Sequence, residues 1–290
     1  MFRVRLFLLT AATLLCFASN SLLTRGALAT DRLDWASFTL IRLVTGALTL
    51  ALLVRLRRAP SGSGGSWLAG AALAGYAVAF TLAYTLIGAA VGALLLFGAV
   101  QATMIGVGLV RGERPARLDW VGVALAISGL LALTVPGVTA PHPAGAVLMI
   151  AAGVCWGGYS LAGRGSLNPL VDTTRNFVRA TVLAVVPVAF LASGRRYSTV
   201  GVLLAAASGS IASGVGYTLW YSVLPALAAW RAAIVQLIVP VLTALLAAVL
   251  LGETITPRLL IATALIACGV WLTTTSGAFS RTQKDPRGPR

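Results

Sequence analysis

Charged side chains are scarce in this chain, and acidic ones are the scarcest. Only 10% of its 290 residues are charged, and seven of them are Asp or Glu. Soluble domains usually carry roughly 25% charged residues. This composition excludes an ordinary water-soluble domain, and so few carboxylates leave little material for acid, base or metal chemistry.

Cysteine and histidine are also rare. The three cysteines, Cys16, Cys155 and Cys268, all fall inside apolar stretches, and their odd number and wide spacing exclude a disulfide framework or a metal site. The one histidine, His142, stands between two prolines. An enzyme would need a cluster of acid, base, nucleophile or metal ligands. We find none, and therefore expect no catalytic residues, no metal, no cofactor and no enzymatic activity.

Long apolar runs, in contrast, fill the sequence, which is 58% hydrophobic. A helix of about 20 apolar residues crosses the roughly 30 Å hydrocarbon layer of a membrane. Five such segments occur in the first half, at 6–23, 35–54, 67–87, 89–110 and 120–135, and five in the second, at 144–161, 177–191, 200–223, 232–251 and 259–275. The sequence predicts an all-α integral membrane protein with ten transmembrane helices.

The basic residues are divided unequally between the two sides of these predicted helices. When the loops are assigned alternately, fifteen Arg and Lys residues fall on the side of both termini and five on the other side. Such a bias marks the cytoplasmic side. We therefore expect a multi-pass protein of the cell inner (plasma) membrane with both termini in the cytoplasm. The bias also explains the net charge of +15 without a nucleic-acid partner, because basic loops interact with membrane lipid.

The two halves of the chain repeat each other. The run from Cys16 to Leu22 matches the run from Cys155 to Leu161 at an offset of 139. Further matched positions are Arg25 with Arg164, Arg42 with Arg179, Tyr84 with Tyr221, and Gly112-Glu113 with Gly252-Glu253. Because each half has an odd number of helices, the second half must be inverted in the membrane. We expect repeats at 1–141 and 142–276, followed by a basic cytoplasmic tail at 277–290, all in one integral unit.

This repeat resembles the drug/metabolite transporter superfamily, specifically its EamA-type ten-span exporters, and is similar to the aromatic amino acid exporters. The resemblance is carried by small and polar residues before an arginine at the end of the first helix, an arginine inside the second, and a Gly-Glu pair closing the fourth and ninth. It implies export of a small organic solute. Val100 departs from the pattern, because its repeat partner is Pro240 and a proline is common there in both halves.

No carboxylate lies near the middle of a predicted helix. The seven acids, Asp31, Asp34, Glu113, Asp119, Asp172, Glu253 and Asp285, all lie in loops, in the tail or at helix ends. Proton-coupled antiporters generally use an ionisable relay inside the membrane. We therefore predict a facilitator that works by alternating access without proton coupling. A proton-coupled cationic drug antiporter and an intramembrane lipid-modifying enzyme are the alternatives.

Polar and aromatic residues inside the predicted helices are the candidates for the solute pathway. They are Asn20, Tyr76, Tyr84, Gln101, Trp156, Tyr159, Tyr217, Trp220, Tyr221 and Gln236. Gln101 stands out because an amide halfway along an apolar helix needs a partner or water, although it could instead bond a neighbouring helix. The aromatic residues favour aromatic or hydrophobic amino acids, or related small metabolites, as the solute. We expect the protein to be a monomer or a homodimer.

Two arginines, Arg42 and Arg179, occupy matched positions inside predicted helices. A charge there must reach the membrane surface, find a partner or face water. The two side chains either anchor helix ends to carbonyls and lipid phosphates, or line the pathway and attract a substrate carboxylate.

Overall fold

The structure, a computed structural model, describes residues 2–28, 32–59, 64–87, 89–134, 142–191, 197–251 and 257–279. These residues form ten membrane-spanning elements, two of which are interrupted. The first five are α1 (Phe2–Leu28), α2 (Trp35–Leu56), α3 (Trp67–Ala83), α4 (Ala89–Val110) and α5 (Arg117–Thr134). The second five are α6 (Pro143–Gly163), α7 (Pro169–Leu191), the continuous run of α8 (Thr199–Ala207), the π-helix η1 (Ser208–Val215) and α9 (Gly216–Val223), the pair α10 (Ala229–Gln236) and α11 (Ile238–Leu251), and α12 (Pro257–Phe279). A short 3-10 turn, η2 (Leu224–Ala226), follows α9.

Short polar side chains begin several of these helices. The hydroxyl of Ser66 accepts the backbone N–H of the third residue after it, and Ser198 does the same for α8. Helix α7 begins at Pro169, eight residues before the start that hydrophobicity predicts. Its cap is Asn168, whose side-chain oxygen accepts the N–H of Val171, and a proline at the first helical position is favourable. Hydrophobicity missed this turn because its residues are polar.

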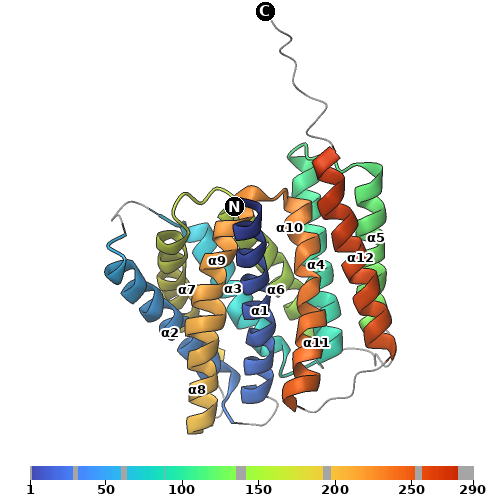
Figure 1. Cartoon of the computed structure of the whole chain (residues 1–290). Coiled ribbons are helices and arrows are strands. Elements are labelled where there is room, and N and C mark those ends of the chain that lie inside the picture. Colours follow the sequence, from blue (N-terminus) through green and yellow to red (C-terminus); the bar gives the residue numbers. More distant parts are fainter. Residues whose placement is uncertain are drawn as a thin grey trace, which may run out of the picture.

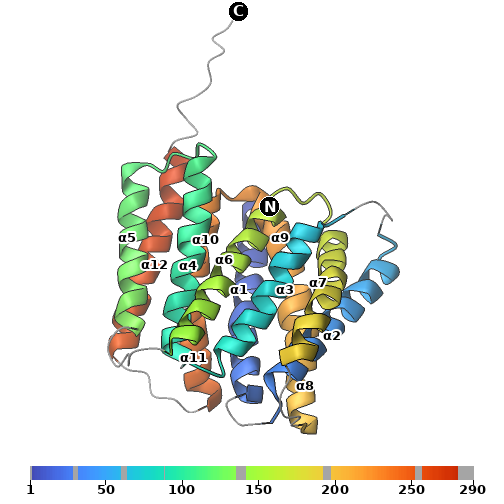
Figure 2. The same cartoon turned by 180° about the vertical axis from the view of Figure 1, so that it is seen from behind.

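Helices of one half pack against helices of the other, and equivalent helices of the two halves make equivalent contacts. Helix α3 packs on α6 and α7, and its repeat partners α9 and η1 pack on α1 and α2. In the same way α4 packs on α6 while α11 packs on α1. Helices α5 and α12 stand together at one edge of the molecule, and α2, α7 and α8 at the other (Figure 1, Figure 2). An inverted five-helix repeat requires such matched contacts between its halves, and they confirm the predicted fold.

The backbones of α2 and the π-helix η1 approach each other closely where the two helices cross. Gly46 of α2 and Gly209 of η1 face each other, and a Cβ on Gly46 would lie 2.9 Å from the carbonyl oxygen of Gly209. Only glycine permits backbones to approach so closely. A π-helix is rare and frequently marks a functional position. Here it places η1 directly against the part of α2 that carries Arg42.

Apolar side chains cover the outside of the molecule. Leu48, Leu68, Val186 and Ile211 are among the large hydrophobic residues that the described part of the chain exposes. By length and composition, four described segments are apolar enough to cross a membrane: Val4–Leu28, Trp35–Leu56, Pro143–Gly163 and Thr199–Ala226. Helix α1 begins and α12 ends at the same side, which we call the N-terminal face; it is at the top in Figure 1.

Candidate functional site

A cluster of aromatic rings occupies the centre of the molecule, where the two halves meet. We call it the central aromatic cluster: Phe17 from α1, Tyr76 and Phe80 from α3, Trp156 and Tyr159 from α6, and Tyr217 and Trp220 from α9. The ring centroids of Trp156 lie 5.0 Å from Tyr76, 4.7 Å from Tyr217 and 5.2 Å from Phe17. Five of the predicted pathway residues therefore come together in one cluster.

Arg42 of α2 lies against this cluster and is buried, with 1% of its surface exposed. Its Nε donates to the hydroxyl of Ser213 at 2.9 Å, and its Nη2 donates to the hydroxyl of Tyr217 at 2.5 Å. The guanidinium carbon lies 5.3 Å from the ring centroid of Tyr76 and 5.9 Å from that of Phe80. Nη1 is buried without a hydrogen-bond partner. Both partners of Arg42 are neutral hydroxyls, so its charge is only partly compensated.

A second polar group joins α4, α6 and α10. The indole Nε1 of Trp156 donates to Oε1 of Gln236 at 2.6 Å, and Nε2 of Gln236 contacts the sulfur of Met104 at 3.3 Å. Nearby, Nε2 of Gln101 donates to the carbonyl oxygen of Ala233 at 2.9 Å, while its Oε1 is buried without a partner. The amide nitrogen of Gln101 thus makes the interhelical bond that was the alternative to a pathway role.

That bond to Ala233 has a local cause. The run of α10 and α11 is interrupted after Gln236, where the N–H of Leu237 bonds Ile234 instead of continuing the α-helical ladder. The carbonyl of Ala233 is then free for Gln101. In a membrane such a carbonyl needs a partner, because lipid offers none.

Other predicted residues sit around the cluster. Asn20 accepts a hydrogen bond from the hydroxyl of Ser208 at 2.6 Å, which ties α1 to the π-helix. The hydroxyl of Tyr159 is buried without a partner. The backbone carbonyl oxygen of Tyr159 accepts a hydrogen bond from the hydroxyl of Tyr221 at 3.0 Å. Tyr84 lies at the end of α3 and packs against the cluster in an edge-to-face contact with Phe80.

Arg179 has a different position from its repeat partner Arg42. Its Nη1 donates to the carbonyl oxygen of Gly64 at 3.2 Å, and its guanidinium carbon lies 5.5 Å from the ring centroid of Trp67. On the same face of α7, Asp172 and Asn176 accept the next two backbone N–H groups of this loop. Arg179 therefore fastens the loop between α2 and α3 to α7, away from the central aromatic cluster.

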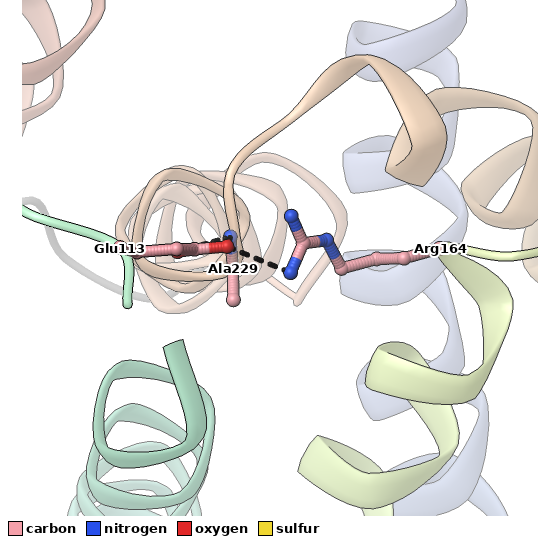
Figure 3. Close-up of polar contacts among 3 residues, drawn as sticks. All are labelled: Glu113, Arg164 and Ala229. Carbon is pink, nitrogen blue, oxygen red and sulfur yellow. Dashed lines mark hydrogen bonds and ion pairs between the residues drawn. The ribbon is translucent and has the colours of Figure 1, made fainter. Parts of the chain in front are cut away.

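Glu113, which follows α4, joins the two halves at the N-terminal face. Its carboxylate makes an ion pair of 2.8 Å with Arg164, after α6, and accepts the backbone N–H of Ala229 at 3.0 and 3.1 Å. Figure 3 shows the carboxylate of Glu113 beside Ala229, with the guanidinium of Arg164 directed toward it. Ala229 is the first residue of α10, so the carboxylate also meets the positive end of a helix dipole. One side chain of the first half thus holds two elements of the second.

Hydrophobicity and composition missed four residues that shape this site: Phe17, Phe80, Ser208 and Ser213. A signal for two of them existed in the repeat, because Phe17 aligns with Trp156 and Phe80 with Tyr217. In the part of the chain that the structure describes, no three His, Cys, Asp or Glu side chains lie together to hold a metal ion. The site is therefore built from rings, hydroxyls, amides and one guanidinium.

Comparison with known proteins agrees with this architecture. Residues 143–275 match the EamA-like transporter family. An uncharacterized protein of Pseudomonas aeruginosa is 48% identical over 269 residues, which cover 92% of this chain and 94% of that protein. A solved crystal structure shares the fold with a TM-score of 0.76 at 21% identity, covering 92% of this chain and 99% of the other. With its ten membrane-spanning elements in two inverted repeats, the chain belongs to the EamA-like transporter family.

Proposed function

We propose that the chain is a facilitator that exports small amphipathic metabolites, with aromatic or hydrophobic amino acids and related compounds as the favoured class. The observation that carries this proposal is the central aromatic cluster. It lies where solute sites of inverted-repeat transporters occur, at the interface of the repeats and inside the membrane. Its rings offer flat apolar surfaces, and the neighbouring amides, hydroxyls and Arg42 offer polar contacts.

The cycle follows from the contacts between the halves. In this structure Glu113 joins the halves at the N-terminal face. Release of these contacts would open a path from that face to the cluster, as alternating access requires. We assign the N-terminal face to the cytoplasm of a bacterial-type inner membrane, because it carries most of the described arginines outside the membrane, such as Arg55, Arg57 and Arg111.

Proton coupling is not part of the proposal. Among the described residues, the carboxylates belong to Asp34, Glu113, Asp119 and Asp172, which lie in loops or in the first turn of a helix. The central aromatic cluster therefore contains no described carboxylate or histidine, the side chains that usually relay protons inside membranes.

Transport by the purified protein in liposomes tests this function. A panel of labelled amino acids, related metabolites and organic cations should be offered with and without an imposed pH gradient. We expect saturable uptake of aromatic or hydrophobic compounds that persists when the pH gradient is abolished. Uptake restricted to cations and strictly dependent on a proton gradient would instead establish the antiporter alternative.

A further inference from the structure

The guanidinium of Arg42 has more donors than the protein uses. An arginine carries five N–H bonds, directed as a planar fork that suits a carboxylate. Here one N–H is directed to Ser213 and one to Tyr217, while Nη1 is buried with no partner. A nitrogen that is charged, buried and unpaired is costly, and inside membranes such groups usually serve a solute or an ion.

No described carboxylate neutralises Arg42, because each is engaged elsewhere. Asp34 caps α2, Glu113 pairs with Arg164, Asp119 accepts the N–H of Ala116, and Asp172 accepts the N–H of Gly65. The described groups around the guanidinium are the hydroxyls of Ser213 and Tyr217, the ring and hydroxyl of Tyr76, and the ring of Phe80. The centre of the molecule therefore carries about one uncompensated positive charge.

The aromatic rings beside Arg42 determine which kind of molecular body a negatively charged solute can have. Tyr76 touches both the guanidinium and Trp156, and Trp156 in turn packs against Phe17 and Tyr217. A planar apolar body can stack on such rings. In contrast, no described acidic side chain is present to bind an ammonium group. The ring of Tyr76, which could attract a cation, already faces the guanidinium of Arg42.

We propose that Arg42 binds the carboxylate of the transported solute, and that the preferred solute carries a net charge of minus one. The class is a small monocarboxylate with an aromatic or branched apolar body and no ammonium group. This inference rests on the proposed transport function and changes its favoured class, because it moves the preference from zwitterionic amino acids to the related carboxylic acids of similar shape that lack the ammonium group.

The test uses three compounds that share one ring and side chain but differ in net charge: phenylpropionate, phenylalanine and phenethylamine. Binding to the purified protein is measured by quenching of tryptophan fluorescence, and uptake is measured separately in liposomes. We expect phenylpropionate to bind tightest and to be transported fastest. Tighter binding and faster uptake of phenylalanine would overturn the inference, while the proposed export of amino acids would stand.

Variants identify the residue responsible. Arg42→Gln should weaken phenylpropionate binding by about 10- to 100-fold, as expected for loss of a charged hydrogen-bonded pair, and should abolish the preference for the anion. Arg42→Lys should keep part of that preference, because the charge remains. Arg179→Gln is the matched control: it removes the repeat partner, which fastens a loop, and should leave the order of the three compounds unchanged.

The outcomes separate the site from the function. Anion binding that depends on Arg42, without uptake of any compound, would support the site and refute the transport function. An unchanged preference in an Arg42→Gln protein with normal melting would overturn the inference. If Arg42→Gln does not fold, Arg42→Lys decides: it keeps the charge but loses the planar fork, so it should bind phenylpropionate more weakly than the wild type while still preferring it to phenylalanine. Unchanged binding of all three compounds in that variant would overturn the inference.

Discussion

Replacing Arg42 by methionine should hardly change the stability of the folded protein. The replacement loses two interhelical hydrogen bonds, each worth about 0.6 kcal/mol in membranes, and two weak cation–π contacts worth about 0.5 to 1 kcal/mol each. It also removes a charge that costs about 2.5 to 3.5 kcal/mol at the centre of a membrane helix. These contributions nearly cancel, so the free energy of unfolding should stay within about 1 kcal/mol of the wild type.

Methionine suits this comparison because it is unbranched and fills the space of the arginine stem. The assay is thermal unfolding of both proteins in the same detergent, followed by size-exclusion chromatography to measure the folded fraction, with binding of phenylpropionate measured in parallel. We expect similar melting temperatures and lost binding. A destabilisation of about 3 to 5 kcal/mol, the usual effect of breaking a buried ion pair, would show that Arg42 holds the two halves together and would refute the reasoning.

Three further predictions concern the amide, the closed face and the topology. Gln101→Ala should raise the half-saturation concentration for uptake while the melting temperature stays nearly unchanged, because it deletes one hydrogen bond worth about 0.6 kcal/mol; a collapse of folding with normal uptake per folded molecule would make Gln101 structural. Thr173, the fifth residue of α7, is fully buried and can carry a probe cysteine. Glu113→Gln should speed labelling of Thr173→Cys from the N-terminal face by about two- to tenfold, because an ion pair and a helix-end contact are weakened; equal rates would show that Glu113 does not hold this face closed. A membrane-impermeant thiol reagent should label Arg57→Cys only after the cytoplasmic side is exposed, and labelling of intact cells would contradict the assigned orientation.

Hydrophobicity and the repeat predict the number of spans, their inversion and much of the aromatic cluster. They do so because lipid demands long apolar helices, and because repeated positions meet at a common interface. Hydrophobicity did not predict the start of α7, because the first turns of this helix carry the charged residues Asp172 and Arg175. The polar cap at Asn168 and Pro169 was the better guide there.

The fate of the two matched arginines could not be read from their alignment. Arg42 meets the hydroxyl of Tyr217, whose repeat partner is Phe80, a residue with no hydroxyl. At the position that matches Tyr217, Arg179 meets no hydroxyl, and its Nη1 bonds the carbonyl oxygen of Gly64. The two guanidinium groups therefore meet different neighbours, and this difference becomes visible only once the helices are placed.

The proposed selection of anions by Arg42 has an energetic consequence for the direction of transport, because an anionic solute carries its charge across the membrane. A solute that carries one negative charge takes that charge across the membrane in each cycle, whatever the carrier itself does. An inside-negative potential of about 100 mV is worth about 2.3 kcal/mol for each charge that crosses. That energy corresponds to a concentration ratio of roughly 50 in favour of the outside. The resting voltage of the cell would then drive expulsion of the solute on its own, without a proton relay inside the membrane.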